Sequence, residues 1–213
     1  MELLFSDDAV LVLNKPAGLP VLPDGWERDA PYLVKMLEEQ YGKLWIVHRL
    51  DKSTSGVMVF ARTAEAHRLL NIQFEGHSVR KTYHAIVEGV PAWNEKTARH
   101  PLRADVGHRH RTVVNDKTGK SAETGFRVIR RWPEYALLEA SPITGRPHQI
   151  RAHAAALGHP ILGDALYGAA ATDLIARPAL HARTLAFTHP VTNQGVSFSV
   201  QSPADFDEAL KKL

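Results

Sequence analysis

The chain has 213 residues, 44% of them hydrophobic and 23% charged, with 26 basic residues against 23 acidic ones and no cysteine. This composition excludes a disordered chain and a membrane protein, and the lack of cysteine excludes disulfide bonds, thiolate chemistry and zinc ribbons. Because no apolar run approaches the length of a membrane-spanning helix and no signal peptide begins the chain, we expect a cytoplasmic protein that contacts no membrane. The length suits one sizeable core, or two lobes that share a cleft, and we expect a single domain over residues 1–213.

The first expected elements are a strand and a helix. Residues 10–13 are apolar and predict a short buried strand, which ends in a turn that contains Pro16 and Gly18. From residue 31 onward apolar side chains recur at intervals of three and four, and Gly42 follows as a stop signal. We therefore predict an amphipathic helix over residues 31–41, and we expect the turn before it to line a cleft.

The most distinctive stretch runs from His48 to Gly56 and reads His-Arg-Leu-Asp-Lys-Ser-Thr-Ser-Gly. It places one carboxylate, Asp51, between two cations and follows it with hydroxyl residues and glycine. Because apolar runs flank it at 44–47 and 57–61, we predict a loop between two strands, which is a common location for reactive groups. The alternative is a surface turn in which Asp51 only accepts hydrogen bonds from nearby backbone N–H groups.

Three known phosphate-binding or nucleophile signatures do not fit this chain. A dehalogenase-type phosphotransferase needs a second aspartate two positions after Asp51, and an esterase elbow needs glycine two positions before Ser55. Ser53 occupies both of these places. The Gly-Lys-Ser sequence at 119–121 lacks the earlier glycine of a phosphate-binding P-loop, because Val114 stands there.

Two elements are expected after the loop and its second strand. Thr63 is a suitable N-cap for a helix that ends at Gly76. Residues 81–87 then alternate as a strand, with Tyr83 on one face. This pattern alone favours an ordinary core aromatic at Tyr83.

Residues 91–121 are rich in proline, charge and histidine and have no sustained periodicity, so we expect an extended excursion from the sheet. Between residues 100 and 111, three arginines and three histidines stand against one acid, Asp105. Such a run can attract an RNA backbone through counterion release, or it can be a solvated basic face without a partner. His108 and His110 do not complete a metal-ligand set, so we expect no metal site.

The C-terminal part of the chain predicts more strands and helices. Strands are expected at 124–130 and 136–140 around a turn at Pro133, with flanking aromatics that either stack on bases or shield the hairpin. A helix is expected at 148–157, with Pro147 in its first turn and Arg151 facing either a cleft or solvent. The remaining predictions are a rigid loop at 160–168, a strand pair at 185–187 and 196–200, and a C-terminal helix from residue 202.

This mixture of strands and interspersed helices predicts an α+β fold. Four stretches carry a more specific likeness: Lys15-Pro16-Ala17-Gly18-Leu19, His48-Arg49-Leu50-Asp51 with Ser53-Thr54-Ser55-Gly56, Arg80-Lys81-Thr82-Tyr83, and Thr144-Gly145-Arg146-Pro147-His148-Gln149-Ile150-Arg151. In this order they resemble the RluA-type family of pseudouridine synthases and cover nearly the whole chain. The resemblance implies a central, mostly antiparallel mixed sheet with flanking helices and a catalytic cleft, without the extra RNA-binding domain of many relatives.

The resemblance also implies a function and its residues. The protein would isomerise uridines in tRNA, rRNA or both, as a monomer without a cofactor and with no DNA partner. Asp51 would be the catalytic aspartate, Tyr83 the active-site tyrosine and Arg151 the arginine that pairs with the aspartate. The residues expected to bind RNA are Arg49, which would fill the space left by the flipped base, and His48, Lys81, Arg146 and His148.

Two rival functions belong to other classes. In a non-catalytic RNA-binding module the basic run would grip phosphates, and Asp51 would be only a turn residue. In a phosphotransferase Asp51 would accept a phosphoryl group, which the serine at position 53 disfavours. Release of tritium from uridine labelled at its fifth carbon distinguishes all three.

Overall fold

A computed structural model describes residues 1–23, 30–107 and 111–213 of the chain. The chain folds into two compact units, each built from two separate stretches. The first unit combines Met1–Arg80 with Ala182–Gln201, and the second combines Lys81–His181 with Ser202–Leu213. The two histidines that were considered for metal binding, at 108 and 110, lie outside the described residues.

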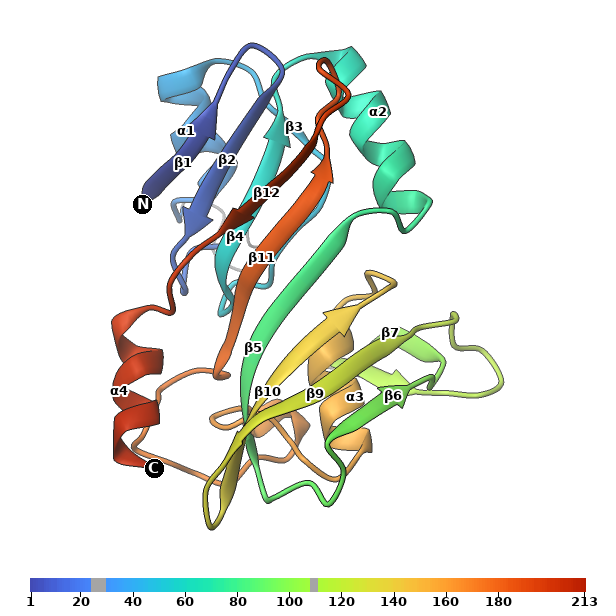
Figure 1. The fold of residues 1–213 in the computed structure, drawn as a ribbon, viewed down its shortest axis with the longest axis vertical. Coiled ribbons are helices and arrows are strands. Elements are labelled where there is room, and N and C mark those ends of the chain that lie inside the picture. The colour runs from blue at the N-terminus through green and yellow to red at the C-terminus, as the bar shows by residue number, and fades with distance from the viewer. Residues whose placement is uncertain (24–29, 108–110) are drawn as a thin grey trace. The chain divides into compact units, whose positions relative to one another are not determined.

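The first unit is a sheet accompanied by helices (Figure 1). Its elements are β1 (Glu2–Ser6), β2 (Val10–Lys15), α1 (Leu33–Tyr41), β3 (Trp45–Ile46), β4 (Ser55–Ala61), α2 (Ala64–Glu75), β11 (Leu180–Thr188), which enters this unit at residue 182, and β12 (Gly195–Ser199). The strand order is β1-β2-β4-β11, with β3 paired to β4 and β12 paired to β11. The pairs β1–β2, β2–β4, β3–β4 and β11–β12 are antiparallel.

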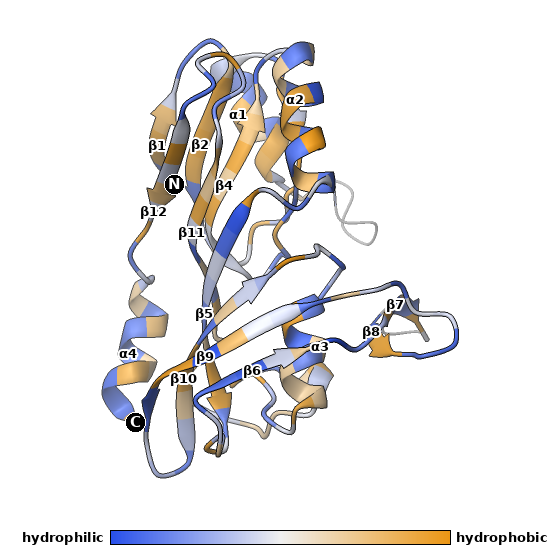
Figure 2. Cartoon of the chain, turned by 45° about the vertical axis from the view of Figure 1, so that its right-hand side comes forward, coloured by the Kyte–Doolittle hydropathy of each residue, from blue (hydrophilic) through white to orange (hydrophobic). Residues whose placement is uncertain are grey.

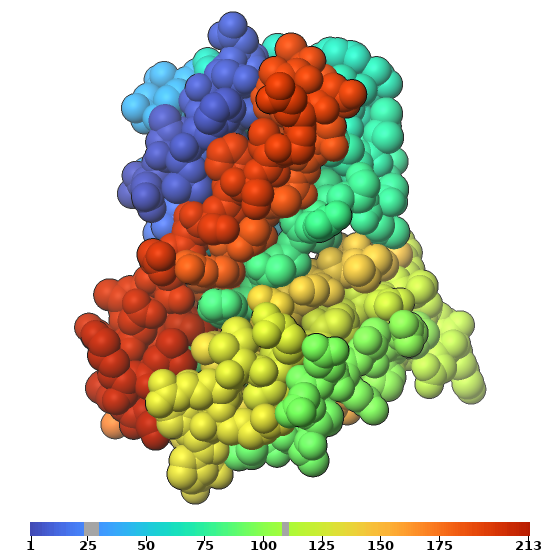
Figure 3. Space-filling model, in the orientation of Figure 1, coloured from blue at the N-terminus to red at the C-terminus, as the bar shows by residue number. Residues whose placement is uncertain are grey.

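The core of this unit forms around β2 and β4, whose residues are almost all apolar and buried. Figure 2 shows the hydrophobic colouring along both strands. Thr63 caps α2 as predicted, because its Oγ1 accepts a hydrogen bond from the Ala66 N–H at 3.1 Å. Ala66 and Leu70 then bury one side of that helix. At the sheet edge β12 alternates between exposed and half-buried residues and lies at the surface on the face drawn in Figure 3.

The second unit also combines antiparallel strands with helices. Its elements are β5 (Arg80–Glu88), β6 (Glu95–Ala98), β7 (Leu102–Val106), β8 (Arg111–Val114), β9 (Thr124–Arg131), β10 (Tyr135–Pro142), α3 (Gln149–Ala156), a short 3-10 turn η1 (Ala165–Tyr167) and α4 (Ala204–Lys212). The strand order is β5-β10-β9-β6, and β7 pairs with β8 in a separate hairpin. Together with the first unit, this arrangement confirms the α+β fold.

Residues 91–121 were expected as an extended excursion from the sheet, but part of this stretch forms a strand of the sheet itself. β6 adds a strand to the sheet edge beside β9, from Glu95 opposite Arg127 to Ala98 opposite Thr124. Only Ala98 of this strand is buried, so the sequence has no periodicity there to detect. The β7–β8 hairpin does project from the sheet, as Figure 2 shows, and it contacts α3.

The start of α3 also differs from the prediction. The helix begins at Gln149, and its N-cap is His148 with a left-handed backbone conformation at φ 52°. Pro147 therefore precedes the cap instead of occupying the first turn. Elsewhere the predicted helix and strand positions are confirmed to within a few residues, including α4 after Pro203.

No helix in the described part of the chain combines the length and the hydrophobicity that crossing a bilayer requires.

A buried histidine and an aspartate connect two turns of the first unit. Asp7 Oδ1 accepts hydrogen bonds from the N–H groups of Ala9 and Val10, both at 2.8 Å, and Oδ2 lies 3.0 Å from His189 Nε2. Burial acts to raise the pKa of Asp7, but the two backbone hydrogen bonds and the neighbouring imidazole outweigh it and lower that pKa. Because the carboxylate is favoured in the folded state, Asp7 contributes stability above its unfolded pKa of 3.8 and loses it as pH falls through the lower folded value.

We expect Asp7→Asn to lower the free energy of unfolding at pH 7 by no more than about 1 kcal/mol, since the site is partly exposed and screened. The difference from the unsubstituted protein should shrink as pH falls below 3.8, because Asp7 is protonated first in the unfolded chain and then, at lower pH, in the folded protein. Urea unfolding at several pH values measures this. The exposed neighbour Asp8, changed to Asn, is the control, and an Asp7→Asn effect that grows toward low pH would contradict the assignment.

Candidate active site

Asp51 lies in a short turn between β3 and β4 of the first unit. The turn is closed by a hydrogen bond from the Thr54 N–H to the Asp51 carbonyl oxygen at 3.0 Å. Thr54 and Ser55 are buried, whereas Asp51 is half-buried. The predicted loop between two strands is confirmed. Its Asp51 carboxylate is partly accessible, whereas the residues that follow at 54 and 55 are buried.

The last residue of this stretch, Gly56, is in a position that only glycine can occupy. Its backbone has φ +122°, and a Cβ atom there would overlap the carbonyl oxygen of Ala182 on β11. Only glycine fits both the dihedral angle and the close approach. The Asp51 turn is therefore fixed directly against a neighbouring strand at its C-terminal end.

A buried lysine fixes the other side of the turn. The Lys15 side chain is fully buried, and its Nζ donates to the carbonyl oxygens of Pro16 and Leu19, both at 2.8 Å, and of Lys52 at 3.3 Å. The Gly18 N–H donates to the same Lys52 oxygen at 2.8 Å. One ammonium group thus joins the loop after β2 to the residue next to Asp51. The sequence suggested a turn here, but it gave no sign that the lysine is buried, because backbone carbonyl oxygens such as these leave no mark in the sequence.

Arg49 and His48, both predicted to bind RNA, differ in their surroundings. Arg49 is exposed. The His48 ring stacks on Phe74 of α2 at 4.8 Å and 19°, and its Nε2 accepts a hydrogen bond from the Val59 N–H at 3.1 Å. Since a protonated imidazole has no acceptor, this hydrogen bond requires a neutral ring with its proton on Nδ1. His48 therefore supports the fold of the loop, which the sequence did not indicate.

Tyr83 and Lys81 lie on β5 in the second unit. Tyr83 is opposite Ala140 of β10 and packs against the hydrophobic core while remaining half-buried. The Tyr83 ring therefore contributes to the core, as an ordinary core aromatic would, and is also partly accessible, as an active-site tyrosine must be. Burial lowers the pKa of the Lys81 ammonium.

Arg151 is buried in the first turn of α3 and does not face solvent. Its Nε donates to Asp164 Oδ2 at 2.6 Å, and its Nη2 donates to Asp164 Oδ1 at 2.8 Å. The guanidinium also lies over the ring of Tyr167, 4.9 Å from the ring centre. Asp164 was expected only as part of a rigid loop, so the sequence did not identify this buried ion pair.

Gln149 organises the segment that precedes Arg151. Its Oε1 accepts hydrogen bonds from the Thr144 hydroxyl at 2.7 Å and the Arg146 N–H at 3.0 Å. Its Nε2 donates to Glu123 O and to Thr124 Oγ1, both at 2.9 Å. The Gln149 amide thus holds the turn on which two predicted RNA-binding residues lie.

Those two residues are Arg146 and His148, and each has a partner within the second unit. The half-buried Arg146 donates from Nε to the Ser121 carbonyl oxygen at 3.1 Å. His148 Nδ1 lies 3.1 Å from the Tyr167 hydroxyl. Both side chains are therefore held in defined positions near the start of α3.

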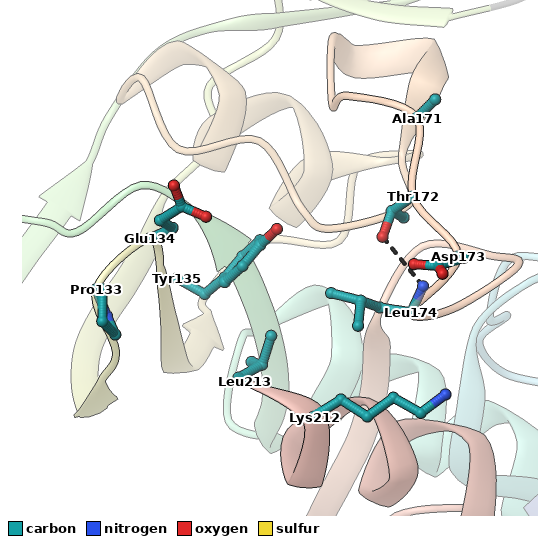
Figure 4. Close-up of a pocket in the computed structure, with 9 residues that line it drawn as sticks. All are labelled: Pro133, Glu134, Tyr135, Ala171, Thr172, Asp173, Leu174, Lys212 and Leu213. Atoms are coloured by element: carbon teal, nitrogen blue, oxygen red, sulfur yellow. Dashed lines mark hydrogen bonds between the residues drawn. The ribbon is translucent and has the colours of Figure 1, made fainter.

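The second unit also contains an open pocket of about 850 Å³ between the β9–β10 turn, the 171–174 loop and the end of α4 (Figure 4). Its lining includes Tyr135, Leu174 and Leu213 together with Glu134 and Lys212. None of the predicted catalytic or RNA-binding residues lines it.

Comparisons with known proteins identify the family. The sequence model of the family described as RNA pseudouridylate synthase matches residues 9–156. The chain belongs to this family. It is 37% identical over 230 residues to the ribosomal large subunit pseudouridine synthase D of Zymomonas mobilis, covering 100% of this chain and 73% of that protein. It is also 40% identical over 208 residues to the dual-specificity RNA pseudouridine synthase RluA of Salmonella typhi, covering 97% and 94%.

Solved structures support the same assignment for the pseudouridylate synthase fold. Human RNA pseudouridylate synthase domain containing 1 is similar with a TM-score of 0.81 and 26% identity, covering 98% of this chain and 86% of that one. Human RNA pseudouridylate synthase domain containing 4 gives a TM-score of 0.78 at 26% identity, covering 99% and 92%. The predicted family and fold are confirmed, and the protein is an RNA pseudouridine synthase.

We expect Lys15→Met to lower the free energy of unfolding by roughly 2–4 kcal/mol, because it removes the buried ammonium group that three carbonyl oxygens share. Urea unfolding followed by circular dichroism measures the loss. Lys35→Met is the matched control, since Lys35 is exposed on α1. Equal stability of the two variants would show that the carbonyl groups do not depend on the Lys15 ammonium.

Proposed function

We propose that this synthase isomerises uridines in structured RNA, either tRNA, rRNA or both, with Asp51, Tyr83 and Arg151 in one active site. The family match carries the proposal, because it spans residues 9–156 and so includes all three residues. The substrate class is supported by similarity to one relative named for the ribosomal large subunit and another named as a dual-specificity enzyme. In this proposal residues 1–213 act as one catalytic domain, as a monomer in the cytoplasm.

The reaction needs a group that stabilises charge or attacks, and a path for one proton. The bond between uracil N1 and ribose C1′ breaks, the ring turns, and C5 forms a new bond to C1′ while its proton leaves and N1 gains one. We assign the first role to the Asp51 carboxylate, acting on either the ribose or the ring. The half-buried turn supports this role, because it keeps a carboxylate accessible on a fixed backbone.

Arg151 is assigned to hold Asp51 ionised. A guanidinium has five N–H donors in a fixed plane, which suits it to bind more than one acceptor, and Asp164 binds the Arg151 Nε and Nη2 groups. A cation beside an aspartate favours its charged form. This role requires a buried, always-charged arginine, and the burial of Arg151 fits it.

Tyr83 is assigned to the detached ring. A half-buried tyrosine can stack on uracil, and its hydroxyl can take part in removing the C5 proton. No cofactor enters this scheme, since a carboxylate, a cation and a phenol supply the charge stabilisation and the proton path.

RNA binding is assigned to Arg49, His48, Lys81, Arg146 and His148. The target base must leave its stack, which costs a few kcal/mol in a duplex and less in a loop. Arg49 is the side chain that would fill the vacated space, and its exposure fits that role. The side chains of His48, Arg146 and His148 each have a partner within the protein, so they would contact RNA from fixed positions.

We expect Asp51→Asn to abolish isomerisation without unfolding the protein or removing most of its RNA affinity. The amide has nearly the same shape but no charge, and affinity depends on phosphate contacts spread over many cations. Tritium release from RNA labelled at uracil C5, together with RNA binding by filter retention, measures both properties. Appreciable turnover by the purified variant would refute Asp51 as the catalytic group.

Arg49→Ala and Arg151→Ala should fail differently. If Arg49 fills the gap left by the flipped base, Arg49→Ala should slow the single-turnover rate more on a structured stem than on a flexible single strand, where unstacking costs less. If Arg151 holds Asp51 ionised, Arg151→Ala should slow the reaction on both RNAs by the same factor. Single-turnover rates at saturating enzyme measure this, and equal losses for Arg49→Ala on the two RNAs would leave Arg49 as a phosphate or structural contact.

A further inference from the structure

The second unit contains a buried cluster around Arg151 that the proposed chemistry does not yet use. Asp164 binds the guanidinium through two parallel hydrogen bonds, and its side chain has only 1% of its surface exposed. Bidentate pairing of this kind fixes both the plane and the direction of an arginine head group. The edge of the guanidinium that faces away from Asp164 can therefore point in one direction only.

Tyr167 completes the cluster from a second side. Its ring packs under the guanidinium, and its hydroxyl accepts a hydrogen bond from the Thr112 N–H on β8 at 2.8 Å. The same hydroxyl lies 3.1 Å from His148 Nδ1. Burial raises the pKa of Tyr167, so the phenol stays neutral and can donate to the histidine while it accepts from β8.

The segment that carries both residues is held rigidly. Gly163, directly before Asp164, has φ +77°, and a Cβ atom there would overlap the carbonyl oxygen of Arg177. The Leu162 N–H donates to the Ile86 carbonyl oxygen of β5 at 2.9 Å, and the Tyr167 N–H donates to the Asp164 carbonyl oxygen at 3.0 Å. Backbone hydrogen bonds thus fix the segment that carries Asp164 and Tyr167 to β5 and join the two residues to each other.

Tyr167 also connects Arg151 to a basic part of the chain. Its partner Thr112 belongs to the β7–β8 hairpin, where Arg103 and Arg111 are exposed. Exposed arginines on a projecting hairpin are suited to phosphate contacts. A shift of β8 on binding RNA can reach the ring beneath the guanidinium through the hydrogen bond between the Thr112 N–H and the Tyr167 hydroxyl.

We propose that Asp164 and Tyr167 are positioning residues for Arg151, and that the Tyr167 hydroxyl couples the orientation of this arginine to the β7–β8 hairpin. The proposal rests on the role of Arg151 assigned above. Asp164 sets the direction of the guanidinium, and the Tyr167 ring supports one of its faces. The hydrogen bond from β8 to the Tyr167 hydroxyl makes the position of that ring depend on the hairpin. Neither residue touches the reacting atoms in this scheme.

Two substitutions separate the parts of the cluster. Asp164→Asn keeps the side-chain size and removes the charge and one acceptor oxygen, whereas Tyr167→Phe keeps the ring and removes only the hydroxyl. Asp205→Asn is the matched control, because Asp205 binds Arg177 in the same bidentate way, at 2.7 and 2.9 Å, elsewhere in the second unit. All are compared with Arg151→Ala in the full-length protein.

Four properties are measured for each variant. The first is the single-turnover rate at saturating enzyme on an RNA that the unsubstituted protein modifies. The others are the RNA affinity, the thermal midpoint, and the NMR signal of the Arg151 Nε–H group with and without RNA. We expect Asp164→Asn to slow the single-turnover rate by about 10²-fold, as misplacement of a reacting geometry does, with RNA affinity nearly unchanged. Tyr167→Phe should slow it less and should remove the effect of RNA on the Arg151 signal. Asp205→Asn should lower only the thermal midpoint.

The possible outcomes are distinguishable. If Asp164→Asn turns over at the normal rate while Arg151→Ala is impaired, the positioning role is refuted and the function of Arg151 stands. If Arg151→Ala is itself fully active, the assigned role of Arg151 fails and the positioning role fails with it. Should Asp164→Asn not fold, Tyr167→Phe decides, because an unchanged rate and an unchanged response of the Arg151 signal to RNA would overturn the coupling.

Discussion

The buried ammonium group of Lys15 is the constraint on which the arrangement of the Asp51 turn depends. It lies at the end of β2 and binds three carbonyl oxygens, one of which belongs to the residue after Asp51. A buried cation without acceptors is too costly to keep, so the loop after β2 and the Asp51 turn must both present their carbonyl groups to it. With Gly56 pressed against β11 on the other side, the backbone that carries Asp51 has little freedom left.

The second unit solves a similar problem with a different partner. Its buried cation, Arg151, is neutralised by the carboxylate of Asp164, and Tyr167 covers one face of it. The two units therefore each hold one half of the proposed chemistry on a rigid support: the reactive carboxylate in the first, and the cation and the aromatic ring in the second. The Gln149 amide extends this support to the turn that carries Arg146, because its Oε1 accepts from the Arg146 N–H and its Nε2 donates to the Glu123 carbonyl oxygen.

Much of the fold was predictable because its signals are local. The apolar runs of β2 and β4, the Thr63 cap and the glycine stop after α1 depend only on neighbouring residues, and each was confirmed. β6 was missed because an edge strand with one buried residue has no pattern. The ion pair between Arg151 and Asp164, and the partners of Lys15, join residues distant in the sequence or use backbone oxygens, so neither residue type nor spacing marks them. The length of the chain allowed either one core or two lobes, and the single domain expected over residues 1–213 stays a prediction.

The central claim is that Asp51 acts on a uridine removed from its stack, with Arg151 beside it. The most direct test is a crystal structure of the protein bound to an RNA substrate in which the target uridine carries fluorine at C5, because fluorine replaces the proton that must leave and should halt the reaction on the enzyme. We expect the fluorinated ring outside the RNA stack, the Asp51 carboxylate next to the ring or to C1′, and Arg151 bound to both Asp51 and Asp164. A target base held against other residues, with Asp51 turned away from it, would contradict the account.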